Sequence, residues 1–181
     1  YKNGQWVTSV ALTSFGVLYV GLLFSHFILL RQLPGTPVPI MSHFILDRGE
    51  ALLWVVLLGT WASDTFAYFI GVAIGSHKLI PAVSPKKSVE GAVAGFVGSI
   101  AVVMALGVKW LSYPAERMVG LALIIALFAP LGDLVESILK RNCEIKDSGN
   151  FFPGHGGVLD RCDSLLFAIP LAYYYIILVL H

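Results

Sequence analysis

The chain has few charged residues for its 181-residue length. Asp, Glu, Lys and Arg make up 13% of it, whereas 57% of the residues are hydrophobic and the mean hydropathy is +0.80. Because soluble domains carry about 25% charged residues, this composition argues against a soluble protein. The formal net charge is only +1, so bulk charge gives no indication of a nucleic-acid partner.

Cysteine is also scarce, and several common catalytic motifs are absent. Cys143 and Cys162 are too few for a four-ligand zinc site, and no Cys-x-x-Cys occurs, so we expect reduced, structural thiols. The sequence contains no Gly-x-x-x-x-Gly-Lys-Ser/Thr, no His-Glu-x-x-His and no Gly-x-Ser-x-Gly. The first absence excludes a P-loop nucleotide site, and the second argues against a zinc protease.

Long apolar runs make up most of the chain. A helix of about 20 apolar residues crosses the hydrocarbon core of a bilayer. Five runs approach or reach this length, namely Val7–Leu30, Ala51–Gly75, Gly91–Leu111, Met118–Arg141 and Ser164–Leu180. The sequence therefore predicts an all-α, polytopic integral membrane helix bundle with about five transmembrane helices.

We expect two parts, an N-terminal span and connector over residues 1–50 and a membrane domain carrying the site over residues 51–181. Three prolines in the connector, Pro34, Pro37 and Pro39, argue against a continuous helix there. The start at Tyr1 lacks a charged n-region, which indicates a processed or truncated chain rather than a signal peptide.

One stretch between the last two spans concentrates charge. Residues 137–163 read SILKRNCEIKDSGNFFPGHGGVLDRCD, with acids and bases around four glycines. The preceding span ends in a polar stripe, since Asp133, Glu136, Ser137 and Lys140 follow helical spacing. Glu136 and Lys140 could form only a helix salt bridge, but the density of charge beside a membrane indicates a site for a charged ligand.

Two other segments add polar groups on the same side. Asp64 lies in the second span, where a carboxylate at mid-membrane costs roughly 2.5–3.5 kcal/mol; it is functional, or it lies near the interface and bonds a neighbouring helix. The loop at residues 76–90 is basic, and Ser88 with Glu90 suits a helix start. The glycine face of the third span, built from Gly91, Gly95 and Gly98, permits close helix contact.

Mixed acids and bases around glycine turns suit a metal-bound phosphate. Carboxylates hold Mg²⁺, which also binds substrate phosphates, and lysines and arginines neutralise the remaining phosphate oxygens. Glycines such as Gly156 and Gly157 let backbone N–H groups approach an anion. The alternatives are that the bases bind only lipid headgroups, that His155 caps a turn and that Asp147 is a turn residue.

The charge distribution predicts the orientation of the spans. Eight of the twelve basic residues fall on the side of the charged stretch, and four fall on the other. Under the positive-inside rule the charged stretch is cytoplasmic, where a nucleotide is available.

The charged stretch resembles the signature of phosphatidate cytidylyltransferases, also called CDP-diacylglycerol synthases. Every fixed position of that signature is present between Ser137 and Asp163, and one variable position departs, because Cys162 stands where an aliphatic residue or Thr is usual. Two further stretches resemble the family, namely Asp64-x-x-Ala67-Tyr68-x-x-Gly71 and Ser84-Pro85-Lys86-Lys87-Ser88-x-Glu90-Gly91. The resemblance runs from about Trp54 to the C-terminus, and members usually have further N-terminal spans.

The resemblance implies an enzyme that transfers a cytidylyl group from CTP to phosphatidic acid, giving CDP-diacylglycerol and pyrophosphate. It implies Asp133 and Asp160 as ligands of Mg²⁺, with a second cation such as K⁺, and Lys146 as a further catalytic residue. The implied substrate-binding residues are Asp64, Ser84, Lys86, Lys87, Ser88, Lys140, Arg141, Asp147, His155, Gly156, Gly157, Arg161 and Asp163. Membrane lipids are expected partners, nucleic acid is not, and a homodimer is suggested by the family and the glycine face.

The expected location is a bacterial inner membrane, with the catalytic loop facing the cytoplasm. Two other functions stay open. A CTP-dependent enzyme resembling polyprenol kinases would release CDP instead of pyrophosphate. An ion transporter would use Asp64 and Asp133 as intramembrane carboxylates, although it needs carboxylates along a path through the bilayer.

Overall fold

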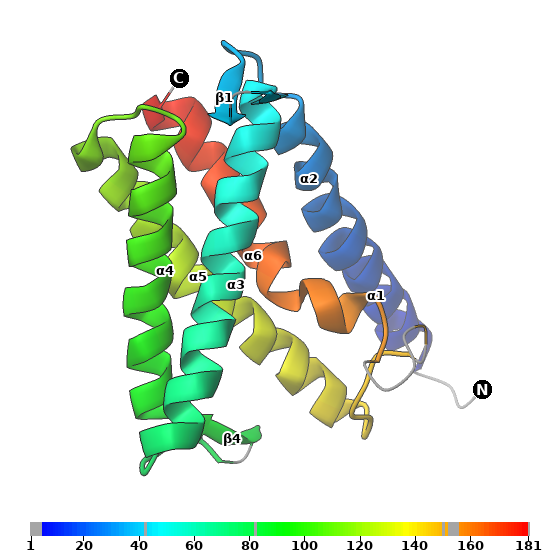
Figure 1. Ribbon diagram of the computed structural model, residues 1–181. Helices are drawn as coiled ribbons and strands as arrows, with labels where there is room; N and C mark the ends of the chain where they lie inside the picture. Colours follow the sequence, from blue (N-terminus) through cyan, green and yellow to red (C-terminus); the bar gives the residue numbers. More distant parts are fainter. Residues whose placement is uncertain (1–4, 42, 82, 150, 152–155, 181) are drawn as a thin grey trace.

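The computed structural model describes residues 5–41, 43–81, 83–149, 151 and 156–180. Among these residues, five helical segments are long and apolar enough to cross a membrane, namely Trp6–Arg31, Arg48–Ile74, Val89–Lys109, Ala115–Asn142 and Leu159–Leu180. The chain is an all-α, polytopic membrane helix bundle, as the sequence predicts (Figure 1).

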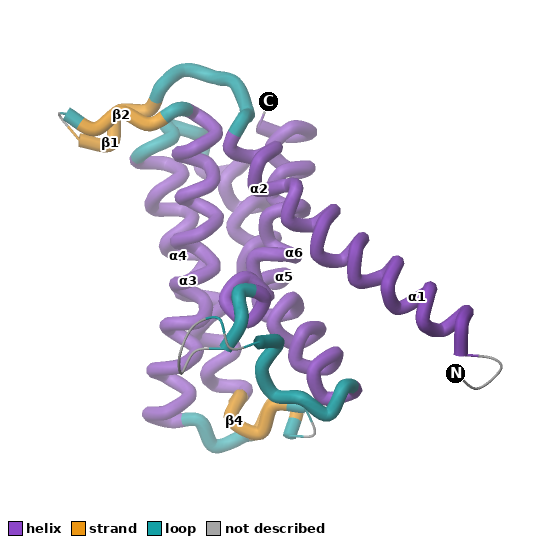
Figure 2. The backbone as a smooth tube through the Cα atoms, turned by 90° about the vertical axis from the view of Figure 1, so that its right-hand side faces the viewer, coloured by secondary structure: helices purple, strands orange, loops and turns teal. Residues whose placement is uncertain are grey.

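The first span stands apart from the bundle along much of its length. It consists of α1 (Gln5–Val17), the π-helical turn η1 (Leu18–Leu22) and α2 (Leu23–Arg31). Figure 2 shows α1 diverging from the other helices, whereas α2 packs against α6 and α3. Apolar side chains of α1 are therefore exposed, as a membrane-embedded helix permits.

α3 (Arg48–Ile74) and α4 (Val89–Lys109) run side by side and approach closely. A Cβ atom at Gly91 would lie 2.6 Å from the Ala67 carbonyl oxygen, and one at Gly95 would lie 2.6 Å from the Ser63 carbonyl oxygen. Only glycine permits this contact, so the glycine face serves packing within the chain. The predicted start of α4 is confirmed, because the Ser88 hydroxyl accepts a hydrogen bond from the Gly91 N–H at 3.2 Å.

α5 (Ala115–Asn142) and α6 (Leu159–Tyr175), which continues into η2 (Ile176–Leu180), complete the bundle behind α3. Buried side chains such as Leu121, Ile125 and Ile169 join these helices to α3 in one apolar core. α6 begins at Leu159, five residues before the predicted span at Ser164. Asp160 and Asp163 therefore lie inside the helix.

Two antiparallel hairpins form where the sequence predicts a connector and a loop, and they lie at opposite ends of the bundle. The β1 (Val38–Met41) and β2 (Phe44–Leu46) hairpin lies at one end, and the β3 (Lys78–Ile80) and β4 (Ser84–Ser88) hairpin lies at the other. The latter pairs Lys78 with Ser88, which brings the basic loop back to the start of α4. The division at residue 50 stays a prediction.

Candidate active site

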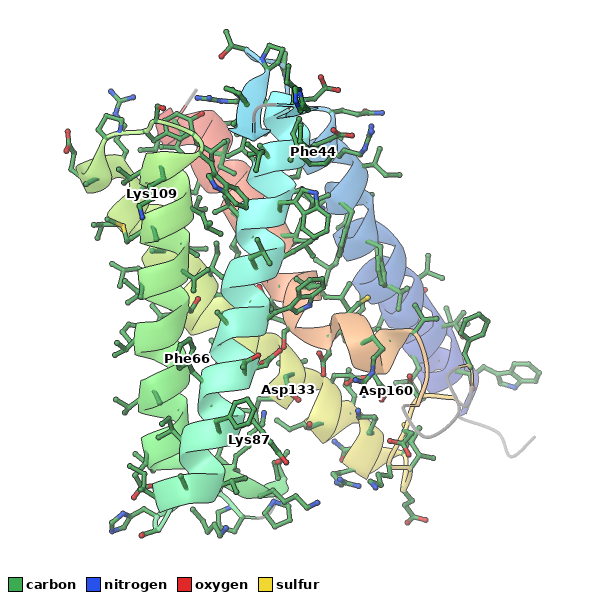
Figure 3. The ribbon with its side chains drawn as sticks, in the orientation of Figure 1. Phe44, Phe66, Lys87, Lys109, Asp133 and Asp160 are labelled. Carbon is green, nitrogen blue, oxygen red and sulfur yellow. The ribbon has the colours of Figure 1, made fainter. Side chains whose placement is uncertain are left out.

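Polar side chains from three segments gather at the β3–β4 end of the bundle. Figure 3 shows Lys87, Asp133 and Asp160 in this half of the molecule, whereas Phe44 and Lys109 lie at the opposite end. They come from β4, from the second half of α5 and from the start of α6. Gly132 lets α5 and α6 meet here, because a Cβ atom on it would lie 2.5 Å from the Asp163 carbonyl oxygen.

Asp133 connects the basic hairpin to α5. Its Oδ2 lies 2.5 Å from the Lys87 ammonium nitrogen, and both side chains are 29% exposed. Its Oδ1 accepts a hydrogen bond from the Ser137 hydroxyl at 3.3 Å. Asp64 on α3 and Asp163 on α6 both lie within electrostatic range of Asp133. The Asp133 carboxylate therefore joins β4 to α5.

Asp160 has a more enclosed carboxylate, with 6% of the side chain exposed. Its Oδ1 accepts a hydrogen bond from the Lys140 ammonium at 2.7 Å. Its Oδ2 accepts hydrogen bonds from the Ser148 N–H and hydroxyl, both at 2.8 Å, and from the Gly157 N–H at 2.7 Å. Gly156 has a φ of +82°, a conformation that glycine adopts readily. This turn folds the charged loop back onto the start of α6.

Two residues that contact this site were not among the predicted site residues. Glu136 is buried, and its Oε2 accepts a hydrogen bond from the Lys140 ammonium at 2.8 Å. The salt bridge foreseen for this pair is thus confirmed, but Lys140 also reaches Asp160 across the helix interface. Ser148 contributes two of the donors to Asp160. The polar stripe on α5 could have indicated Glu136, whereas nothing in the local sequence indicates that Ser148 donates hydrogen bonds to Asp160.

The structure leaves other predicted residues away from these ion pairs. Four are exposed and take part in none of the ion pairs among the described residues, namely Lys86, Lys146, Asp147 and Arg161. Arg141 donates to the Ile145 carbonyl oxygen at 3.4 Å. Ser84 begins β4, and Ser88 is buried as the cap of α4. His155 lies outside the described residues. Substrate roles for these side chains stay predictions.

The donor chemistry of Asp133 and Asp160 fits a hard divalent cation. Carboxylate oxygens are the ligands that Mg²⁺ prefers, and one or two of them suffice when substrate phosphates and water complete the shell. Within the described part of the chain, no group of three or more acidic, histidine or cysteine side chains is placed to enclose a metal ion. Each of the two aspartates is paired with a lysine in the structure.

Comparison with known proteins decides the family. The model of the cytidylyltransferase family matches residues 2–179 of this chain. The chain belongs to the cytidylyltransferase family. Its relatives include phosphatidate cytidylyltransferases of three bacteria, each aligned over most of this chain.

The relatives are moderately similar and longer than this chain. The protein of Bacillus subtilis is 38% identical over 178 residues, which cover 96% of this chain and 60% of the relative. The protein of Synechocystis sp. is 37% identical over 190 residues, covering 96% of this chain and 64% of the relative. The protein of Thermotoga maritima is 36% identical over 177 residues, covering 93% and 60%. The chain thus spans 60–64% of the length of these relatives.

Proposed function

We propose that this chain carries the catalytic part of a phosphatidate cytidylyltransferase, which converts CTP and phosphatidic acid into CDP-diacylglycerol and pyrophosphate. The family and the names of its relatives support this proposal. The observation that carries it is the placement of Asp133 and Asp160. They lie on two packed helices at one end of a membrane bundle, and each carboxylate is paired with a lysine.

The proposed reaction needs positioning more than proton transfer. A phosphate monoester carries about −1.5 to −2 charges at neutral pH, so the lipid phosphate is already a nucleophile. One of its oxygens forms a bond to the α-phosphorus of CTP as the bond from that phosphorus to the pyrophosphate oxygen breaks. The barrier lies in bringing two polyanions together and in stabilising the leaving pyrophosphate, which cationic and dipolar groups accomplish.

Lys87 and Lys140 would neutralise this charge. Each ammonium has three donors, of which Lys140 uses two for Glu136 and Asp160. A phosphate oxygen beside either lysine would find a cation already held in position by a carboxylate. Lys146, Arg141, Arg161 and His155 would extend this positive surface toward the remaining phosphates.

Asp133 and Asp160 would hold Mg²⁺, with a second cation such as K⁺ nearby. The bound ion would withdraw negative charge from phosphate oxygens. The lysines that now pair with the two aspartates would then be available to phosphate. Ser148 and Gly157 keep the Asp160 carboxylate oriented through their N–H and hydroxyl groups.

The two other functions have less support. A CTP-dependent polyprenol kinase would use similar phosphate contacts, but the relatives are named for cytidylyl transfer to phosphatidate. An ion transporter needs carboxylates along a path through the bilayer, whereas Lys87, Asp133 and Asp160 lie in one half of the bundle (Figure 3).

The deciding experiment measures pyrophosphate release from CTP and phosphatidic acid by the full-length protein in detergent, with and without Mg²⁺. We expect Asp133→Asn to abolish release, and Asp47→Asn to leave it unchanged because Asp47 is exposed at the opposite end of α3. Release of CDP instead of pyrophosphate would favour the kinase. Turnover that is unchanged in Asp133→Asn would contradict the proposal.

We further propose that this end of the bundle faces the cytoplasm of a bacterial inner membrane. Cys143 is exposed just beyond α5, whereas Cys162 is half-buried in α6. In a Cys162→Ala variant, an impermeant thiol reagent should label Cys143 in inside-out vesicles and not in intact cells. The opposite labelling pattern would reverse the orientation. The predicted homodimer stays a prediction, and the glycine face does not support it because that face packs against α3.

A further inference from the structure

Glu90 lies in the first turn of α4, and both of its carboxylate oxygens accept hydrogen bonds from one residue, His77. The His77 backbone N–H donates to Oε1 at 3.2 Å and to Oε2 at 3.3 Å. The imidazole Nδ1 lies 2.6 Å from Oε1, and because an ionised carboxylate only accepts hydrogen bonds, this nitrogen is the donor. The sequence predicts Glu90 only as part of a helix start, whereas the structure gives its side chain a partner 13 positions earlier in the chain.

This contact closes the base of the β3–β4 hairpin. His77 directly precedes β3, and its carbonyl oxygen accepts a hydrogen bond from the Val89 N–H at 2.9 Å. The next residue along the chain, Lys78, pairs with Ser88. Both backbone polar groups of His77 are therefore bonded to the start of α4, and the N–H is bonded there through the Glu90 side chain.

The hairpin needs an anchor of this kind because its own pairing is weak. β3 has three residues and β4 has five, and the register shifts between Lys78 and Ile80. Pro85 in β4 has no backbone N–H to donate. A two-stranded hairpin is marginally stable by itself, whereas α4 packs closely against α3 along its glycine face. Glu90 therefore joins a weak element to a well-packed helix.

The hairpin carries Lys87 to the candidate site. Lys87 is the penultimate residue of β4, and its ammonium nitrogen lies 2.5 Å from Asp133 Oδ2. The two residues that follow are bonded at the base of the hairpin, Ser88 as the cap of α4 and Val89 as the donor to His77. Fixing the base of the hairpin therefore also fixes the backbone from which the Lys87 side chain extends.

We propose that Glu90 is a positioning residue for Lys87. Through His77 it fixes the base of the β3–β4 hairpin, and the hairpin then holds the Lys87 ammonium at Asp133. Because the His77 side chain is 82% exposed, its ion pair with Glu90 contributes little to global stability, so the effect of losing it is local to the hairpin. The inference rests on the proposed cytidylyltransferase function for its kinetic consequences alone.

The kinetic test measures the KM for CTP of the full-length Glu90→Ala protein. It should rise about 3- to 10-fold, which is the size expected for one lost hydrogen bond. The double variant Glu90→Ala/Lys87→Ala should have the same KM as Lys87→Ala alone, because both changes act through one ammonium. Glu90→Gln keeps an acceptor oxygen for the His77 N–H, so its KM should lie between those of Glu90→Ala and the unmodified protein.

Glu116→Ala is the matched control, because Glu116 is an exposed residue in the first turn of α5, which begins at the opposite end of the bundle (Figure 1). It should leave the KM for CTP unchanged. A KM for Glu90→Ala equal to that of Glu116→Ala, or losses that multiply in the double variant, would overturn the inference.

A second variant decides the question if Glu90→Ala does not fold. His77→Ala removes the imidazole donor and keeps the backbone N–H that binds Glu90. The KM for CTP should therefore rise only about two- to threefold, as expected for an exposed ion pair. A KM that does not change in His77→Ala would then contradict the positioning role.

A further measurement does not depend on turnover. Hydrogen exchange of the β3 and β4 amides reports local opening of the hairpin, and it should be several-fold faster in Glu90→Ala than in Glu116→Ala. Modification of Lys87 by an amine reagent, followed by mass spectrometry, should be faster in the same variant. Equal rates in the two variants would refute the positioning role. If the unmodified protein fails to turn over CTP but the variants show these differences, the proposed function fails and the positioning of Lys87 stands.

Discussion

At the β3–β4 end of the bundle, carboxylates and lysines from several segments lie together, whereas the contact between α3 and α4 is built from glycines and apolar side chains. Asp160 alone accepts hydrogen bonds from Lys140, Ser148 and Gly157. Along the α3–α4 contact, Gly91 and Gly95 let the helix backbones meet. The first region brings charges together, whereas in the second region glycines let the backbone and the apolar side chains of the facing helix approach closely.

The two regions are expected to contribute differently, the polar end to turnover and the α3–α4 contact to stability. Partly buried ion pairs lose much of their attraction to desolvation and are weak evidence for stability. Close contact between small residues, by contrast, is a main source of helix association in membranes. Damage at the polar end should therefore reduce turnover more than folding, and damage at the α3–α4 contact should do the reverse.

The largest effect is expected from Asp160→Asn, at the polar end of the bundle. The amide cannot supply the charge that holds Lys140 and that would hold the proposed cation, so pyrophosphate release should fall by about 100-fold or more, as for other lost electrostatic groups. The unfolding midpoint in detergent should fall less than turnover, because Lys140 keeps Glu136 as a partner. A large loss of folded protein with turnover per folded molecule unchanged would break the distinction between the two regions.

A smaller effect, on stability instead of turnover, is expected from Gly95→Leu. Because a Cβ atom there would lie 2.6 Å from the Ser63 carbonyl oxygen, the helices must separate. Overpacking of this kind costs about 1–3 kcal/mol, which denaturant unfolding in detergent would detect. Val93→Leu, on an exposed face of α4, is the matched control and should be neutral. Equal stability of the two variants would show that the glycine contact contributes little.

The smallest effect is expected from Lys87→Ala. This change removes the partner of Asp133 and, in the proposed site, a cation that would bind phosphate, so the KM for CTP should rise about tenfold, as expected for losing a charge-assisted contact. Lys109→Ala makes the same change at the opposite end of the bundle (Figure 3) and should leave the KM for CTP unchanged. Equal KM values for the two variants would show that Lys87 does not contribute to CTP binding.

Much of the fold could be predicted because membrane spans depend on local composition. Runs such as 91–111 and 164–180 are apolar enough to be recognised without knowing their neighbours, and α4 and α6 overlap them. The hairpins could not be predicted in the same way. Pairing of Lys78 with Ser88 depends on a turn and on backbone groups that have no periodic signal over so few residues.

The candidate site shows the same limit at the level of single residues. Asp133 and Asp160 stand out as charges in or beside apolar segments, so spacing and resemblance both indicated them. Glu136 looked like an ordinary partner of Lys140 one turn away, and its burial depends on helices that fold against it. Ser148 carried no signal at all, because a serine in a charged loop is unremarkable until the loop folds back onto the start of α6.

The sequence by itself determined that this is a multi-span membrane protein with one charged end, since hydropathy and charge are properties of each residue and its near neighbours. It also carried the motifs on which the family resemblance depends. The tertiary structure alone decided which groups meet: Lys87 with Asp133, and Lys140 with both Glu136 and Asp160. These side chains come into contact because helices that are far apart in the sequence pack side by side, and no local pattern of residues specifies which helices do so.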